Sequence, residues 1–203
     1  MGDQLARDLK MAARRAPGEK TGTTMGNAID RTLGEPFSQE LETRSGMKLD
    51  LRPVTVSDGP ALADLFHRMD VEDLRFRFLT GLSVVKPHQI ASMIEVDHRQ
   101  AEHLLAFDHA SGALAGSVML VADKGLEIAE VAVVVADEFR GKGIGWTLLR
   151  HAADLARERG LKTLRSIESR ANHDALEVER TLGFRARAYD GDPTLVLVEA
   201  EFN

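Results

Sequence analysis

The pattern of apolar and polar positions changes its period along the chain, and each change predicts an element. Residues 49–54 alternate like a strand, and residues 62–69 then repeat apolar side chains at the i, i+3, i+4 and i+7 spacing of one helix face. An irregular or helical apolar stretch follows at 74–79, and Pro87 opens another helix. The first part of this region therefore predicts one strand followed by helices.

The centre of the chain has the shorter period of strands. Residues 101–107, 113–122 and 126–136 are strand-like, and the turn residues between the first two predict successive antiparallel strands. The third segment contains the unbroken apolar run Val131-Ala132-Val133-Val134-Val135, which is typical of a strand buried on both faces. This strand is therefore expected in the middle of a sheet.

After a glycine-rich turn, the apolar residues return to helical spacing. One stripe runs from Ile144 to Ala156, Gly160 ends it, and strand 162–169 follows. The remaining segments are helix 173–182 and strands 184–189 and 194–201. We expect an α/β (α+β) fold with a mixed, mostly antiparallel central sheet of six to seven strands flanked by helices.

The first 47 residues lack this regularity. Residues 3–15 favour a short basic helix, but Pro17-Gly18 and the glycines and threonines that follow interrupt any longer element. Polar, turn-rich segments bury little apolar area and rarely order themselves. We therefore expect an N-terminal extension over residues 1–47 and a single domain over residues 48–203.

The composition is that of a globular protein, with 43% hydrophobic and 29% charged residues among 203. No apolar run approaches the roughly 18 residues of a membrane span, and the N-terminus lacks the apolar core of a secretion signal. We therefore expect a cytoplasmic protein without a membrane partner. The net charge is −6, and the acidic body disfavours nucleic-acid binding and suits a cationic or amine substrate.

Glycines 141, 143 and 145 stand between the buried strand and the helix after it. Such a turn brings free backbone amides and the positive end of a helix to one point, which suits a phosphate or pyrophosphate. A phosphate-loop NTPase is excluded because no Gly-Lys-Ser/Thr triplet is present. A dinucleotide fold fits poorly, since the sixth position of its glycine motif is Thr147 and the preceding strands read as antiparallel. The third alternative is a coenzyme A site, in which the phosphate loop is only half of the binding surface.

Two sequence blocks carry a family resemblance. Val133-Val134-Val135-Ala136-Asp137-Glu138-Phe139-Arg140-Gly141-Lys142-Gly143-Ile144-Gly145 resembles the acyl-CoA signature of the GNAT acetyltransferase superfamily. Asn172, Ala175, Leu182, Gly183 and Phe184 are similar to the later block of that family, in the same order and at the expected separation. The resemblance covers residues 128–184 and implies a GNAT-like fold with acetyl-CoA as co-substrate.

The resemblance also implies the residues that hold the coenzyme. They are Val133, Val134, Val135, Arg140, Gly141, Lys142, Gly143, Ile144, Gly145, Trp146 and Asn172. The amides of Val133 and Val135 are expected to bind the pantetheine arm like an added strand, with one near Val133 polarising the thioester oxygen. Residues 141–146 are expected to hold the pyrophosphate. A solvated role for Lys142 and a helix-capping role for Asn172 stay open.

Within the superfamily, Met69–Phe78, Ile94–His98 and Glu130–Val135 resemble the acetyltransferase domain of bacterial Pat-type protein lysine acetyltransferases. The resemblance implies N-acetylation of a protein lysine, with an acyl-CoA synthetase as one candidate partner. Two other hypotheses stay open, a small-amine acetyltransferase and a catalytically silent acyl-CoA-binding module. The oligomeric state, monomer or homodimer, also stays open.

Glu130 is the candidate catalytic base. It precedes Arg140 by ten residues, where the Pat-type proteins carry their catalytic glutamate, and a lysine amine with a pKa near 10.4 must lose a proton to react. The family commonly has a tyrosine four residues before the glycine of Gly183-Phe184, and this chain has Glu179 there. Either the thiolate then leaves without a dedicated acid, which its low basicity allows, or water or Glu179 supplies the proton.

No metal site is expected. His98 and His103 are five residues apart across a helix-to-strand transition, and no HExxH motif is present. Ser166, Glu168 and Ser169 on strand 162–169 are candidates to line the acceptor side of the site.

Overall fold

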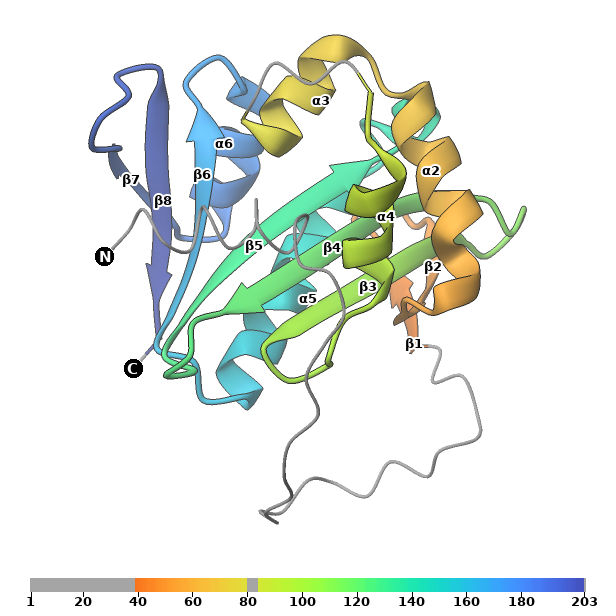
Figure 1. Ribbon diagram of the computed structural model, residues 1–203, viewed down its shortest axis with the longest axis horizontal. Coiled ribbons are helices and arrows are strands. Elements are labelled where there is room, and N and C mark those ends of the chain that lie inside the picture. Colours follow the sequence, from red (N-terminus) through yellow and green to blue (C-terminus); the bar gives the residue numbers. More distant parts are fainter. Residues whose placement is uncertain (1–38, 80–83, 203) are drawn as a thin grey trace.

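The computed structural model describes residues 39–79 and 84–202, and in them eight strands form one sheet (Figure 1). The strands are β1 (Gln39–Glu42), β2 (Lys48–Pro53), β3 (Ala101–Asp108), β4 (Leu114–Ala122), β5 (Ile128–Val135), β6 (Thr163–Ser169), β7 (Arg185–Ala188) and β8 (Leu195–Glu201). Their order in the sheet is β1-β2-β3-β4-β5-β6-β8-β7. Among these described strands every neighbouring pair is antiparallel except β5 and β6, which are parallel.

Helices cover both faces of the sheet. They are α2 (Gly59–Arg68), α3 (Val71–Phe78), α4 (Pro87–Ile94), α5 (Ile144–Glu158) and α6 (His173–Thr181), with short 3₁₀ turns at Val56–Asp58 and Asp137–Phe139. Figure 1 shows α2, α3 and α4 on one face and α5 and α6 on the other. The mixed, mostly antiparallel sheet with flanking helices is therefore confirmed.

The buried positions follow the periods of the sequence. Strand β4 is buried along almost its whole length, as expected of a strand with helices on both sides. On α5 the residues Ile144, Leu148 and Ala152 turn toward the sheet and are at most 1% exposed. A side chain at Gly116 of β4 would place its Cβ 2.5 Å from the carbonyl oxygen of Val134, so this glycine permits the close approach of β4 and β5.

The sheet begins earlier than expected. Gln39–Glu42 forms β1 and pairs with β2, from Gln39 opposite Leu51 to Glu42 opposite Lys48. The sheet therefore has eight strands instead of six to seven, and its first strand lies before the expected boundary at Lys48. The sequence Gln-Glu-Leu-Glu gives little sign of a strand, because only Leu41 is apolar and the strand lies at an edge. The helix expected at residues 3–15 falls outside the described residues.

The parallel strands β5 and β6 pair only at their beginnings. Ile128, Ala129 and Glu130 lie opposite Thr163, Leu164 and Arg165. Beyond Glu130 and Arg165 the strands diverge, as Figure 1 shows. We call the gap between Val131–Val135 and Ser166–Ser169 the strand opening. It interrupts an otherwise continuous sheet near its centre.

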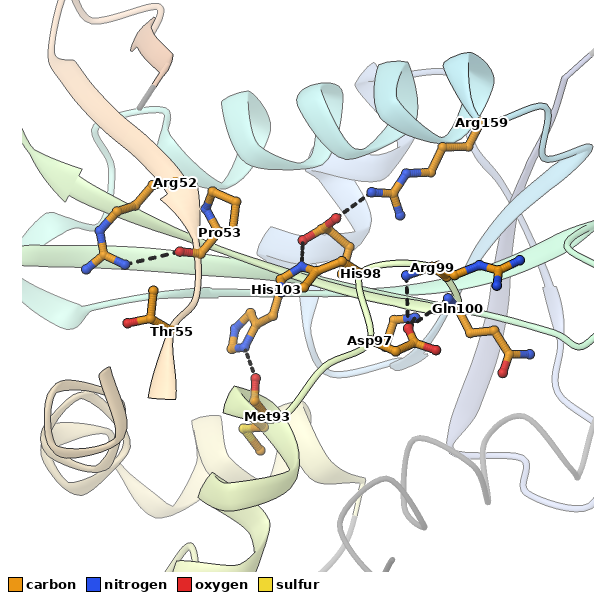
Figure 2. A network of polar contacts seen from close by, with 12 residues as sticks. Arg52, Pro53, Thr55, Met93, Asp97, His98, Arg99, Gln100, His103 and Arg159 are labelled. Atoms are coloured by element: carbon orange, nitrogen blue, oxygen red, sulfur yellow. Dashed lines mark hydrogen bonds and ion pairs between the residues drawn. The ribbon is translucent and has the colours of Figure 1, made fainter. Parts of the chain in front are cut away.

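Polar contacts tie the loop before β3 to its neighbours (Figure 2). The carboxylate of Asp97 accepts hydrogen bonds from the backbone amides of Arg99, Gln100 and Ala101. The ring of His98 lies 2.8 Å from a carboxylate oxygen of Glu102, which also pairs with Arg159. These contacts give the segment at 94–98 a structural role in shaping the turn into β3.

No helix in residues 39–79 and 84–202 is long and apolar enough to span a membrane.

Candidate active site

The strand opening leads into a cavity of about 1850 Å³. Its walls come from α3, β5, the glycine loop (Gly141–Gly145), β6, α6 and the turn between β7 and β8. The cavity therefore joins the segments of both motif blocks with the second half of the sheet. It is the place where a ligand can reach the edge of β5.

Backbone groups of β5 face this cavity. The Ala136 amide donates to the Ala115 carbonyl, and the Asp123 amide donates to the Ile128 carbonyl, so the even-numbered residues of β5 bond to β4. The amides of Val131, Val133 and Val135 then point the other way, toward the strand opening. An extended ligand can pair with this edge as an added strand. Val134 turns its backbone to β4, so it contributes to the cavity wall by its side chain and not by its amide.

The glycine loop ends at the N-terminus of α5. Gly141 and Gly143 have φ angles of 72° and 79°, a left-handed conformation that strongly favours glycine. The first helical bond of α5 runs from the Thr147 amide to the Gly143 carbonyl, and no side chain of the described residues caps the helix. The amides of Ile144, Gly145 and Trp146 therefore have no helical partner and lie at the positive end of the helix dipole, an arrangement that suits an anion and that we call the candidate anion site.

Arg140 and Lys142, two of the residues implied to hold the coenzyme, differ in their positions relative to the cavity. Arg140 lines the cavity, but its guanidinium pairs with Asp73 of α3 and with Asp137 at 3.0 Å. The Nζ atom of Lys142 stands 4.6 Å from the ring centroid of Phe139, and Lys142 is not among the residues that line the cavity. Arg140 therefore ties α3 to the glycine loop, and Lys142 is an exposed residue beside it.

The turn between β1 and β2 supports the glycine loop from outside. The Ser45 hydroxyl donates to the Lys142 carbonyl at 2.8 Å, and the Arg44 guanidinium stacks 3.6 Å from the ring centroid of Trp146. A side chain at Gly143 would stand 3.6 Å from the Arg44 amide nitrogen. Sequence reasoning missed this contact, since it placed Arg44 and Ser45 in an extension, and no local pattern links residues so far apart.

Glu130 lies where β5 and β6 separate. It is 6% exposed, and one of its carboxylate oxygens is 3.9 Å from the Arg165 guanidinium. The guanidinium of Arg77 on α3 also acts on its charge, and burial lowers the pKa of Arg77 to about 10 while Glu130 and Glu168 oppose that shift. The predicted base is therefore a buried carboxylate on the cavity wall, within the field of two arginines.

Asn172 has two partners in the chain. Its side-chain oxygen accepts from the Ala175 amide at 3.4 Å and caps α6, and its side-chain nitrogen donates to Glu168 at 3.0 Å. The capping role left open by the sequence is therefore present. Asn172 also lines the cavity, so contact with a ligand stays a prediction.

Two further carboxyls, Glu168 and Glu179, line the same cavity. Burial, together with the negative charge of Glu179, raises the pKa of Glu168 above the ordinary value. Burial also raises the pKa of Glu179, whose carboxylate accepts a hydrogen bond from the Ser166 hydroxyl. Ser166 and Glu168 therefore stand on the cavity wall as expected, whereas Ser169 is not among the lining residues.

His98 and His103, the two histidines considered from the sequence spacing, have partners within the chain. Nδ1 of His103 lies 2.9 Å from the Met93 carbonyl, and His98 contacts Glu102 (Figure 2). Within the described residues, one group of possible ligands is Glu40, Asp50 and His109, far from the cavity on β1, β2 and the turn after β3. His109 already pairs with Asp50 there, at 3.1 Å.

Comparisons with known proteins agree with this geometry. The acetyltransferase (GNAT) family matches residues 68–184. Acetyltransferase PA5475 of Pseudomonas aeruginosa is 27% identical over 173 residues, which cover 84% of this chain and 92% of that protein. The crystal structure of the GNAT domain of S. lividans PAT superposes with a TM-score of 0.74 and 23% identity, covering 81% of this chain and 97% of that domain.

A second similar structure was solved with the coenzyme. The ribosomal L7/L12 α-N-protein acetyltransferase RimL, in complex with coenzyme A, has a TM-score of 0.64 and 18% identity, covering 76% of this chain and 94% of that one. The family match spans the strand opening, the glycine loop and α6, which are the parts that build the cavity. The chain belongs to the GNAT family of acetyltransferases.

Proposed function

We propose that this acetyl-CoA-dependent N-acetyltransferase transfers the acetyl group to the ε-amine of a protein lysine, with Glu130 as general base. One structural observation supports the mechanism. The unpaired edge of β5, the glycine loop and the buried carboxylate of Glu130 line a single cavity. The donor, the acceptor and a proton acceptor can thus meet at the strand opening.

The chain offers a fitting cradle for the coenzyme. The amides of Val133 and Val135 can pair with the pantetheine arm, and the amide near Val133 can polarise the thioester oxygen. The amides of Ile144 to Trp146 can receive the pyrophosphate at the start of α5. When bound, acetyl-CoA supplies an activated acyl group.

The reaction needs one proton acceptor and one proton donor. The neutral amine nitrogen attacks the thioester carbon, a C–N bond forms, and the C–S bond breaks with its electron pair left on sulfur. Glu130 takes the amine proton through a water, and the thiolate receives a proton from solvent. Its position at the separation of β5 and β6 puts Glu130 beside the edge that binds the donor.

A protein acceptor is supported by the fold comparison and by the cavity. The structure superposes on the GNAT domain of a PAT protein over nearly the whole length of that domain. The cavity is wide and acidic, which suits the aliphatic chain and ammonium of lysine. An acyl-CoA synthetase is the candidate acceptor protein that we favour.

The test is to follow the label from isotopically labelled acetyl-CoA. We would incubate the purified protein with a whole-cell lysate and, separately, with a panel of small amines, and locate the label by mass spectrometry. Label on a few protein lysines supports the proposal and identifies the acceptor. Label on small amines alone contradicts the lysine assignment, and coenzyme binding without any transfer indicates a silent module.

A further inference from the structure

The cavity contains two carboxyls that the mechanism above does not use. They are Glu168 on β6 and Glu179 on α6, which we call the acid pair. Glu179 is 3% exposed and Glu168 is half-buried. Two negative charges in such a place repel each other and lose their hydration, so the pair needs either a proton or a cation.

Hydrogen bonds within the chain satisfy only some of the carboxyl oxygens of the acid pair. Asn172 donates to one oxygen of Glu168, and the Ser166 hydroxyl donates to one oxygen of Glu179. The other carboxyl oxygen of Glu179 is enclosed and has no hydrogen-bond partner among the described residues. A buried carboxyl oxygen without a partner is costly, and a ligand that donates a hydrogen bond would remove that cost.

The charges around the acid pair do not balance. Arg77 from α3 acts on Glu168, and Arg165 from β6 lies beside Glu130. Two guanidiniums thus face three carboxyls, those of Glu130, Glu168 and Glu179. The rest of the cavity wall adds further carboxylates, which are Asp70, Glu72, Asp73, Asp174, Glu177, Asp190 and Asp192, and adds Arg140 and His173 as basic groups. One more positive charge therefore fits beside the acid pair.

The strand register places the acid pair across from the donor. Glu130 and Arg165 are opposite each other, and Val133 and Glu168 each lie three residues further along these parallel strands. Val133 and Glu168 therefore lie on the two sides of the strand opening, each three residues beyond the last paired residues. A positive group held by Glu168 and Glu179 would face the β5 edge where the thioester is proposed to bind.

We propose that the acid pair binds the ammonium group of the acceptor before it reacts. The acceptor class is then a primary alkylammonium, and the inference rests on the proposed N-acetyltransferase function. Because burial raises the pKa of both carboxyls, the empty pair holds a proton more readily than two ordinary glutamates, and binding of the cation favours its release. The bound ammonium loses one proton to solvent water, and the neutral amine then reacts with Glu130 as the base, as proposed above.

The binding test uses a lysine analogue, Nα-acetyl-lysine methylamide, titrated into the coenzyme A-loaded full chain by calorimetry. Coenzyme A replaces acetyl-CoA so that no acetyl group is transferred. Titrations near neutral pH in buffers of different ionisation enthalpy should show release of a fraction of one proton per analogue bound. The norleucine analogue has the same carbon chain without the ammonium group, and it should bind at least about tenfold more weakly. Equal binding of the two analogues, or no release of protons, would overturn the proposal.

The kinetic test compares Glu179→Gln and Glu168→Gln with Glu158→Gln, which removes an exposed carboxylate at the end of α5. Each variant of the acid pair should raise the KM for the amine acceptor about tenfold or more and leave kcat and coenzyme A affinity nearly unchanged. Glu179→Asp should recover part of the acceptor affinity. A loss of kcat at unchanged KM would instead make the pair a proton-transfer group and contradict the proposal.

These measurements distinguish failure of the lysine assignment from failure of the acid-pair proposal. If protein lysines are not acetylated but the analogue binds with proton release, the acid pair stands and the lysine assignment falls. If lysines are acetylated and Glu179→Gln keeps the wild-type KM, the lysine assignment stands and the acid pair has another role.

Discussion

At the strand opening, the surroundings of a residue decide its proposed role more than its residue type does. Glu130, Glu168 and Glu179 are three glutamates on one cavity wall, but their contacts differ. Glu130 lies beside Arg165, whereas Glu179 has the neutral hydroxyl of Ser166. Glu168 in turn lies beside the negative charge of Glu179, and burial raises the pKa of both members of the acid pair. This difference is the physical basis for giving Glu130 the role of base and the acid pair the role of cation site.

The acid pair should make stability depend on pH. Because the pKa values of both carboxyls are raised in the folded protein, it keeps protons that the unfolded chain loses above about pH 4.3. The contribution of the acid pair to the free energy of unfolding is therefore greatest below about pH 4.3 and declines as the pH rises through neutrality. The free energy of unfolding of Glu168→Gln/Glu179→Gln relative to wild type should therefore increase with pH. Urea unfolding of both proteins between about pH 5 and about pH 8 measures it, and parallel curves would contradict the shifts.

The Arg52–Asp58 pair should change stability with pH in the opposite direction, so that its contribution to the free energy of unfolding increases as the pH rises. Arg52 donates to both carboxylate oxygens of Asp58, at 2.8 and 2.7 Å, and this contact lowers the pKa of Asp58 to about 2. The stabilisation is present above the ordinary aspartate pKa and is lost as the pH falls toward 2. Asp58→Asn should cost about 1–3 kcal/mol at neutral pH.

Thermal unfolding of Asp58→Asn checks this expectation, with Asp64→Asn as the matched control. Asp64 pairs with Arg68 on the exposed face of α2, so its loss should change stability far less. A similar Tm for both variants would show that the Arg52–Asp58 pair does not hold the connection between β2 and α2.

At the scale of elements, the glycine loop depends on a turn that lies outside the motif. The β1–β2 turn contacts it through the Ser45 hydroxyl, which holds the Lys142 carbonyl, and through Arg44 on the Trp146 ring. Since the loop must keep two left-handed glycines in place, an outside support limits its alternatives. The first strand of the sheet thus has a functional consequence for the candidate anion site.

We expect Ser45→Ala to weaken coenzyme A binding by about fivefold, because one hydrogen bond of about 1 kcal/mol to the loop is lost. Gly143→Ala should have a larger effect, since it forces a side chain into the left-handed region at a cost of roughly 1–2 kcal/mol. Calorimetric titration with coenzyme A measures both, with the exposed Ser57→Ala as control. Unchanged affinity in Gly143→Ala would contradict the assignment of the loop as the phosphate site.

Element boundaries show what local sequence can predict. The central strands and α5 were predictable because their apolar period is regular over many residues. Segment 74–79 stayed ambiguous because Leu74, Phe76 and Phe78 alternate like a strand. The helix there is fixed by the Asp70 cap, which accepts from the Asp73 amide, and by the contact of Asp73 with Arg140. Strand β1 was not predictable, because its pairing with β2 and not its own four residues defines it.

At the scale of the whole molecule, the site lies where two neighbouring strands, β5 and β6, separate within the sheet. The motif predicted the glycine loop and the strand before it, since both are local features of the sequence. It did not predict that Arg77 and Arg165 would stand by Glu130, because α3, β5 and β6 are brought together only by the fold. The cavity consequently has one side lined by the backbone of β5, where we propose that the donor binds, and an acidic side, where we propose that the acceptor binds.

The central claim, that Glu130 is the base at this opening, is tested most directly by one comparison. Single-turnover acetyl transfer by the wild type and by Glu130→Gln should be measured with the same amine acceptor, together with the coenzyme A affinity of each. We predict a rate about 10²–10⁴-fold lower in Glu130→Gln with unchanged coenzyme A affinity, because only the proton acceptor is removed. Equal rates in the two proteins would remove Glu130 from the mechanism.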